Sequence, residues 1–306
     1  MKHNNEFAKA FFERYSYPEN AVEVFTQVLE RLDSEPEFAD SFDEAVNGYM
    51  FPQAGDLKQA LEKVSALAEE KGINKYTLHF IFLLACAEIL KSRWHLSGFP
   101  EEIYWDTMAD MHYKFKECVD CEEIPGIFVA DWYYGFFDMT RIALGRFQYE
   151  MRQFSPNDEL VTKCGKEIKE GDYYINFHIP SSGVPITDEI RLESYKKAYG
   201  VFGKYFPDGK AVFGCGSWLL FPRHREFLPK NSNILKFMDD FEIICHSEKE
   251  GFSNGWRVFG KYSDLPYDKL PRDTSLRRAY ADWLIAGNKT GDAFGIFVFD
   301  GEKILR

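Results

Sequence analysis

The chain has 306 residues and a formal net charge of −12, from 37 basic and 49 acidic side chains. Aromatic residues make up 17% of it, which excludes a disordered polymer, and the length favours about two folded domains. Most of the negative charge precedes residue 141, where 26 acidic residues stand against 12 basic ones. Because such a surface repels phosphate backbones, we expect no nucleic-acid partner.

Residues 1–15 carry charges throughout and lack the apolar core of a secretory signal. The longest apolar run, residues 80–87, is far shorter than the roughly 20 residues of a membrane-spanning helix. We therefore expect a cytoplasmic protein without a membrane partner, whose six cysteines are free thiols. Cys118 and Cys121 form one CxxC with no second metal-binding pair, so no metal site is expected.

The first part of the chain has the apolar spacing of helices. In residues 18–32 apolar side chains recur every three or four positions, which places them on one helical face. Residues 56–68 repeat this pattern, with Asp56 at the N-cap position. Further helices are predicted at 4–15, 36–48, 74–93, 101–120 and 127–143. The sequence thus predicts an all-helical N-terminal domain over residues 1–143.

After Gly145 the pattern changes, because Phe147, Tyr149 and Met151 alternate with polar residues as in a strand with one buried face. Further strands are predicted at 173–179, 211–217, 241–247 and 256–259, with a last edge strand at 294–299. Helices are predicted at 188–202, 231–240 and 275–286. Interleaved strands and helices predict a mixed α/β domain over residues 144–306.

Several familiar motifs are absent. Gly214 and Gly216 begin a dinucleotide fingerprint, but its third glycine would fall at Leu219. No P-loop or HExxH sequence occurs. A hydrolase in which Cys215 is the nucleophile and His178 or His246 the base stays possible on residue types alone, although a buried structural thiol is the commoner role for such a cysteine.

Five segments carry a resemblance to a known family: LGRFQYEM (144–151), INFHIPSSGVPITDE (175–189), CGSWLL (215–220), LPKNSNILKFMDDF (228–241) and LPRDTSLRRA (270–279). They resemble a bacterial family of acyltransferase-domain proteins, in which a helical N-terminal domain precedes a GNAT-like, acyl-CoA N-acyltransferase C-terminal domain. The resemblance covers most of the chain and is denser after residue 140. It implies a mixed-sheet GNAT-like fold and coenzyme A or acetyl-CoA as cosubstrate.

The resemblance also implies where the cosubstrate binds. In GNAT enzymes a strand leads through a loop into a helix whose first amides hold the pyrophosphate, and residues 173–179, 180–186 and 188–202 have that order. The implied cofactor-binding residues are Phe177, Ile179, Ser181, Ser182, Gly183, Thr187 and Asn233. Gly214 and Gly216 fit a strand backbone that a ligand approaches closely. The loop departs from the family pattern, since it has one glycine and is followed by Asp188 and Glu189, which would compete with a phosphate.

Acyl transfer to an amine needs a proton acceptor, a polarised carbonyl and a proton for the leaving thiolate. His178 or Glu150 is expected to accept the proton, Ser217 to donate one, and backbone amides of residues 177–179 to polarise the carbonyl. The implied function is direct N-acyl transfer, with acetyl-CoA as the expected donor and a small amine or similar nucleophile as the small-molecule acceptor. The alternative is a non-catalytic GNAT-like module that binds a ligand or a protein; the oligomeric state stays open.

Overall fold

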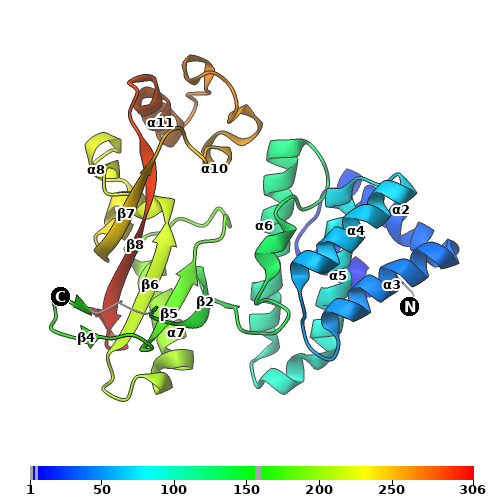
Figure 1. The fold of residues 1–306 in the computed structure, drawn as a ribbon, viewed down its shortest axis with the longest axis horizontal. Helices are drawn as coiled ribbons and strands as arrows, with labels where there is room; N and C mark the ends of the chain where they lie inside the picture. Colours follow the sequence, from blue (N-terminus) through cyan, green and yellow to red (C-terminus); the bar gives the residue numbers. More distant parts are fainter. Residues whose placement is uncertain (1–2, 4–5, 156–159) are drawn as a thin grey trace. The chain divides into compact units, whose positions relative to one another are not determined.

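The computed structural model describes residue 3 and residues 6–155 and 160–306 (Figure 1). The chain forms two compact units, Met1–Ile142, here called the helical unit, and Ala143–Arg306, the sheet unit. Within the described ranges, no helix is both long and apolar enough to cross a membrane. The same ranges contain no group of three or more His, Cys, Asp or Glu side chains that could hold a metal ion.

Six α-helices build the helical unit: α1 (Glu6–Arg14), α2 (Glu19–Ser34), α3 (Pro36–Met50), α4 (Leu57–Lys71), α5 (Lys75–Arg93) and α6 (Glu101–Glu122). Helix α5 contains the longest apolar run of the chain and contacts α2, α3, α4 and α6, so it forms the centre of this core (Figure 1). Asp56 caps α4 by accepting a hydrogen bond from the Gln59 amide at 3.2 Å, which confirms the predicted N-cap.

The helix predicted at 127–143 is wrong. Only a 3-10 turn, η2 (Ala130–Tyr133), forms there, followed by Gly135 and Met139 with left-handed φ values of 84° and 62°. Asp138 Oδ1 then accepts hydrogen bonds from the amide and the hydroxyl of Thr140, which closes a turn. The aromatic side chains of Tyr133, Phe136 and Phe137 are buried although this segment is no helix.

The sheet unit contains a seven-stranded sheet. Its strands run in the order β1 (Ile142–Leu144), β2 (Phe147–Gln153), β5 (Tyr173–His178), β6 (Ala211–Ser217), β8 (Thr290–Phe299) and β7 (Glu242–Lys249), with β9 (Ile304–Leu305) also paired to β8. The β5–β6 pair is parallel, whereas β2–β5, β6–β8 and β7–β8 are antiparallel. A separate two-stranded ladder joins β3 (Leu160–Val161) to β4 (Glu167–Ile168).

Five α-helices accompany the sheet: α7 (Asp188–Phe202), α8 (His224–Phe227), α9 (Asn233–Met238), α10 (Trp256–Phe259) and α11 (Ser275–Ile285). Helices α7 and α9 cover one face, where Tyr195 and Phe237 pack against the rings of Phe147 and Phe177. Since side chains alternate along a strand, the even-numbered residues of β2 and β5 lie on the opposite face. That face carries Gln148, Glu150, Asn176 and His178.

Two strand predictions need correction. Residues 256–259 form helix α10 rather than a strand, because the Phe259 amide hydrogen-bonds to the Gly255 carbonyl at 2.7 Å and closes a helical turn. Residues 294–299 belong to the longer β8, which lies between β6 and β7 and is no edge strand. Strand β8 is buried along most of its length, so its sequence lacks the alternation of a half-exposed strand.

Candidate functional site

The parallel strands β5 and β6 separate before either of them ends. Their pairing comprises Ile175 with Phe213 and Asn176 with Gly214. Beyond this point β5 continues to His178 and β6 to Ser217, while β6 keeps its other neighbour, β8. Across the resulting gap, here called the opening, the described strands form no ladder. An extended ligand can therefore take up backbone hydrogen bonds there, as a strand would.

The two glycines of β6 differ in their surroundings. A Cβ atom on Gly214 would lie 2.7 Å from Cδ2 of Tyr174, so the close neighbour of this glycine is a protein ring and not a ligand. A Cβ atom on Gly216 would have Phe294 as its nearest neighbour, at 3.9 Å. Of the two predicted sites of close approach, Gly216 is the one with free space beside it.

Glu150 is the centre of a buried polar cluster on the face opposite α7. It is 6% exposed, and the β2–β5 register places it directly across from Asn176. Its Oε1 accepts hydrogen bonds from His178 Nε2 at 2.8 Å, from Asn176 Nδ2 at 2.9 Å and from Arg152 Nε at 2.8 Å. A second guanidinium nitrogen of Arg152 lies 2.6 Å from the same oxygen. The carboxylate is thus desolvated but well supplied with donors, as a buried charge requires.

The Glu150 contact decides the protonation of the His178 ring. A carboxylate only accepts, so Nε2 carries a hydrogen, and in the neutral ring Nδ1 carries the lone pair. Asn176 Nδ2 also lies 3.2 Å from Nε2, but a nitrogen that donates to Glu150 has no lone pair left to accept from Asn176. A carboxylate that fixes the tautomer of a partly exposed imidazole is the arrangement of an oriented general base.

Ser217 lies at the end of β6 and caps the short 3-10 turn η4 (Trp218–Leu220). Its Oγ accepts a hydrogen bond from the Leu219 amide at 3.1 Å. The hydroxyl hydrogen is not used in that bond, so it remains available for donation.

The loop between β5 and α7 is held by Arg146, which donates to the carbonyls of Pro180 at 2.9 Å and Val184 at 2.8 Å. Gly183, within this loop, has a left-handed φ of 77°, and no atom lies within 4 Å of the position that its Cβ would take. The loop backbone is therefore anchored at two carbonyls and open to close approach at Gly183.

The first turn of α7 carries its own anion. Thr187 is the N-cap residue, but its side chain makes no capping hydrogen bond. The Glu189 carboxylate instead interacts with its own backbone amide and with the Thr187 hydroxyl, and these hydrogen bonds lower the pKa of Glu189. A phosphate at this helix end would have to displace that exposed side chain.

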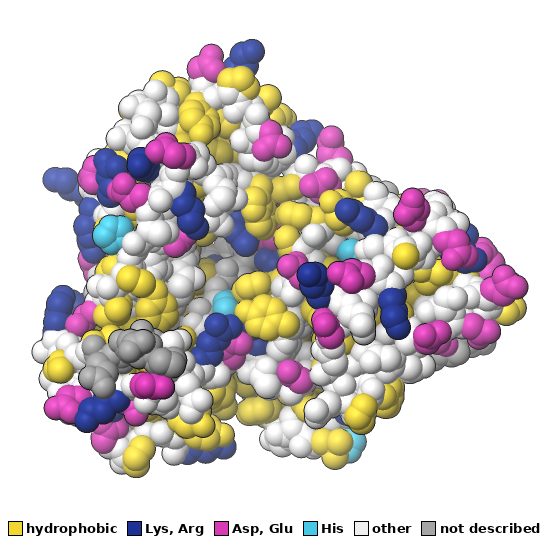
Figure 2. Space-filling model, in the orientation of Figure 1, with side chains coloured by type: hydrophobic (Ala, Val, Ile, Leu, Met, Phe, Trp, Pro, Cys, Tyr) yellow, Lys and Arg dark blue, Asp and Glu magenta, His cyan; other side chains and the backbone are white. Residues whose placement is uncertain are grey.

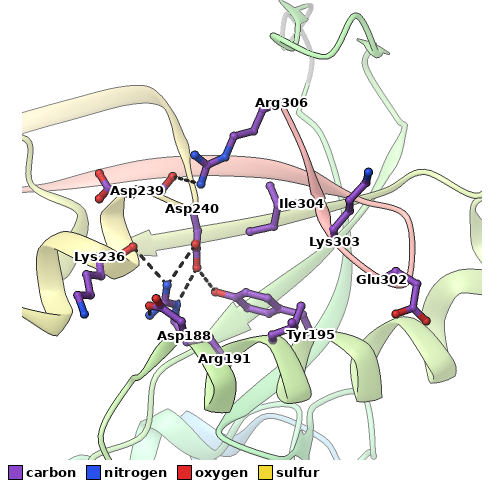
Figure 3. Close-up of a pocket in the computed structure, with 11 residues that line it drawn as sticks. Asp188, Arg191, Tyr195, Lys236, Asp239, Asp240, Glu302, Lys303, Ile304 and Arg306 are labelled. Atoms are coloured by element: carbon purple, nitrogen blue, oxygen red, sulfur yellow. Dashed lines mark hydrogen bonds and ion pairs between the residues drawn. The ribbon is translucent and has the colours of Figure 1, made fainter.

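A pocket of about 610 Å³ opens beside the first turns of α7 (Figure 3). At its base, Arg191 Nε donates to Asp240 Oδ2 at 2.7 Å, and the Tyr195 hydroxyl donates to the same oxygen at 3.0 Å. Lys236 of α9 and, on the other side, Lys303 and Arg306 of the C-terminal segment surround the pocket (Figure 3).

Comparison with known proteins decides the family. Residues 6–139 match the model of the N-acyltransferase N-terminal domain, and residues 142–297 match that of the GNAT-like C-terminal domain. The chain belongs to this N-acyltransferase family. No curated protein matches it.

Solved acyltransferases share the GNAT-like fold of this chain. One, in complex with CoA and 10C-teicoplanin, is 22% identical over 95% of this chain and 87% of its own, with a TM-score of 0.75. A mutant acyltransferase in complex with octanoyl-CoA has the same identity and coverage and a TM-score of 0.74. A third, in complex with decanoyl-CoA, is 20% identical over 94% of this chain and 98% of its own, with a TM-score of 0.59. The predicted fold class, a helical domain followed by a GNAT-like mixed sheet, is thereby confirmed.

In the GNAT-like unit, the predicted His178 and Glu150 are in direct contact, whereas Ser217 lies on the neighbouring strand. Among the residues expected to bind the cofactor, Phe177 points its ring into the core, so only its backbone can face a ligand. Ser181 and Gly183 are exposed, Ser182, Ile179 and Thr187 are half-buried, and Asn233 opens α9.

Sequence reasoning missed Asn176 and Arg152, which complete the Glu150 cluster. Asn176 is two residues from His178 on the same strand face, which was a usable signal, but the pairing with Glu150 depends on the register. The alternative nucleophile Cys215 is 1% exposed, and burial raises the pKa of its thiol far above neutrality. A buried thiol of this kind is inert, so the hydrolase alternative loses its nucleophile.

Proposed function

We propose that this chain is an acyl-CoA-dependent N-acyltransferase that transfers an acyl group directly to an amine. The observation that carries the proposal is the opening between β5 and β6, with the Glu150–His178 pair at the end of β5. Family membership supports the reaction class, and the structural neighbours solved with CoA or acyl-CoA support the donor.

The pantetheine arm of the donor is assigned to the opening, where it would meet the backbone of Phe177 and Ile179 and the free space beside Gly216. The pyrophosphate is assigned to the loop before α7, at Ser181, Ser182, Gly183 and Thr187. Asn233 is proposed to contact the pantetheine as well.

The ADP end of the donor is assigned to the pocket beside α7. The ammonium groups of Lys236 and Lys303 make no hydrogen bond or ion pair with the described residues, so they can bind phosphate. Arg191, by contrast, is already bound to Asp240, and burial raises the pKa of that carboxyl against the opposing effect of Arg191. The buried pair therefore shapes the pocket rather than binding the ligand.

We assign the proton acceptor to His178. The acceptor amine forms its bond to the acyl carbon as the carbon–sulfur bond breaks, and the proton of the amine passes to Nδ1 of His178, directly or through a water. Glu150 holds the ring by accepting from Nε2 and stabilises the imidazolium that results. The Ser217 hydroxyl donates a proton to the leaving thiolate and takes one back from solvent. Backbone amides near residues 177–179 polarise the carbonyl of the thioester.

Glu150 is the weaker choice as the base itself. Its Oε1 already accepts from three side chains, one of them the cationic Arg152, and these hydrogen bonds stabilise the ionised form. A carboxylate stabilised in this way is a poor proton acceptor, but it is well suited to orient an imidazole.

The acyl group is proposed to be longer than acetyl, in contrast to the sequence-based expectation. The structural neighbours were solved with octanoyl-CoA and decanoyl-CoA. The acceptor is proposed to be a small molecule that bears an amino group, and the neighbour solved with CoA and 10C-teicoplanin supports a small-molecule acceptor.

The proposal is tested by titrating the full chain with CoA and with acyl-CoA from two to ten carbons, followed by thiol release with a panel of amines. A ligand at 100 times its Kd should stabilise the fold by about 2.7 kcal/mol. Binding and turnover, strongest with medium-length chains, support the proposal. Binding without turnover on any amine favours the non-catalytic module, and no binding at millimolar CoA removes the acyl-CoA proposal.

A further inference from the structure

The helical unit has a pocket of its own, of about 390 Å³. Its walls come from the end of α3, the start of α4 and the segment from η2 to β1, and its lining residues are Tyr49, Ala54, Gly55, Asp56, Leu57, Lys58, Asp131, Tyr134, Gly135, Asp138 and Thr140. The volume lies within the usual range of small-molecule sites. No step of the proposed acyl transfer uses these residues.

Tyr49 gives this pocket a buried polar group. The residue is 3% exposed, and its ring packs against Phe82 and Phe137. Its hydroxyl lines the pocket without a hydrogen-bond partner in the described chain. Burial, with a contribution from the nearby Asp138 carboxylate, raises the pKa of Tyr49, so the hydroxyl stays neutral. A ligand in the pocket can therefore take this hydroxyl as a hydrogen-bond partner.

The charge of the lining favours a cation. It has three carboxylates, Asp56, Asp131 and Asp138, and one ammonium group, Lys58. The Asp131 carboxylate makes no hydrogen bond or ion pair within residues 6–155 and 160–306. Asp56 and Asp138 each use Oδ1 in local hydrogen bonds, which leaves Oδ2 to accept from a ligand. Asp and Glu side chains are also numerous over the visible surface of this unit (Figure 2).

An organic cation fits better than a metal ion. In the described chain these carboxylates do not converge closely enough to form a metal site. The free volume instead suits an ammonium group on a carbon skeleton, whose three N–H donors can reach several separated acceptors. We propose that this pocket binds the protonated amino group of a small organic amine, with Asp131 as its charged partner and the Tyr49 hydroxyl as an acceptor.

The test is calorimetric titration of the full chain with 1,4-diaminobutane at low salt, with uncharged 1,4-butanediol as the matched ligand control. The diamine should bind and the diol should not. Asp131→Asn should weaken diamine binding by about tenfold, since a charged hydrogen bond is lost. Tyr49→Phe, which keeps the ring, should weaken it several-fold.

Asp120→Asn is the control variant, because it removes the same charge from an exposed position of α6 outside the pocket. It should bind the diamine as the wild-type chain does. If the Asp120→Asn and Asp131→Asn variants lost the same affinity for the diamine, its binding would reflect nonspecific electrostatic attraction to the acidic surface. That result would overturn the proposal. Equal binding of diol and diamine, or no heat from the diamine at about 20 mM, would overturn it too.

These titrations need no acyl-CoA, so they test the amine site independently of the proposed acyl transfer. An acyl-transfer assay with the diamine then identifies the source of the ligand. If Asp131→Asn raises the KM for the amine, the pocket binds the acceptor; if KM is unchanged while binding is lost, the pocket binds a separate effector.

Discussion

At the scale of single residues, the site depends on the different roles of two neighbouring titratable groups. His178 is partly exposed at the end of β5, while Glu150 is buried and accepts three side-chain hydrogen bonds. A base must release its hydrogen bonds to take a proton, and Glu150 would lose more of them than His178. Their contact therefore favours His178 as the proton acceptor and Glu150 as the group that orients its ring.

Substitutions can separate these roles. His178→Ala should lower kcat by about 10²- to 10⁴-fold while the Kd for acyl-CoA stays the same. Glu150→Gln should cost less, and the double variant should be no slower than His178→Ala, because Glu150 acts through His178. Steady-state kinetics and calorimetry measure both quantities. If Glu150→Gln alone removed as much activity as His178→Ala, Glu150 would be the base.

Gly183 allows a test of phosphate binding by charge alone. Asn and Asp both tolerate a left-handed φ of 77°, and the space around a Cβ atom here is empty, so either residue should be accepted by the fold. Gly183→Asp should weaken CoA binding by about tenfold through repulsion of the pyrophosphate, and less so in high salt. Gly183→Asn, of equal size, should bind nearly normally. Equal binding by the two variants would place the phosphates elsewhere.

At the scale of elements, the sequence correctly predicted the helices and strands whose apolar residues follow a regular helical or strand spacing. The helices around residues 18–32 and 56–68 and the strands at 147–151, 173–179 and 211–217 all form as expected. The helix predicted at 127–143 is wrong because Gly135 and Met139 take left-handed φ values after the short turn η2. Strand 294–299 was taken for an edge because its neighbours in the sheet are distant in the chain.

Local sequence patterns predicted the residue types of the candidate site but not the contacts between them. Residue types indicated His178 and Glu150, but their contact arises from the β2–β5 register, which no local pattern contains. Arg152 and Asn176 depend on that register as well. The close neighbour of Gly214 turned out to be Tyr174, since a glycine in a strand shows only that something approaches its backbone, not what it is.

Gly214 and Gly216 allow a matched pair of alanine substitutions within β6. Gly214→Ala would bring a methyl group to 2.7 Å from the Tyr174 ring and should destabilise the fold by about 1 to 3 kcal/mol. Gly216→Ala has its nearest contact at 3.9 Å and should leave the melting temperature unchanged, yet raise the KM for acyl-CoA by narrowing the opening. Denaturant unfolding and kinetics check this; an unchanged KM would move the pantetheine away from Gly216.

At the scale of the whole molecule, each unit contains a buried neutral histidine. His79, in α5, has its Nε2 at 2.8 Å from the Ser65 hydroxyl, and burial lowers its pKa to about 4. His224, in α8, has its Nε2 at 2.5 Å from the Tyr280 hydroxyl, and burial likewise lowers its pKa to about 4. An unfolded chain protonates histidine near pH 6.5. Between pH 6.5 and 4 the unfolded chain therefore binds protons that the folded chain refuses.

The stability of both units should consequently fall as the pH falls from 6.5 towards 4, with each histidine contributing about 3 kcal/mol by pH 4. His79→Gln should reduce the pH dependence of stability in the helical unit, and His224→Gln should reduce it in the sheet unit. Each substitution should do so regardless of how much it lowers the free energy of unfolding at neutral pH. His246→Gln, at an exposed position of β7, serves as the control and should keep the wild-type slope. Urea unfolding at a series of pH values measures the slopes. If neither buried-site variant changed its slope, the two imidazoles would have to be solvated in the folded protein, and the packing around them looser than their burial indicates.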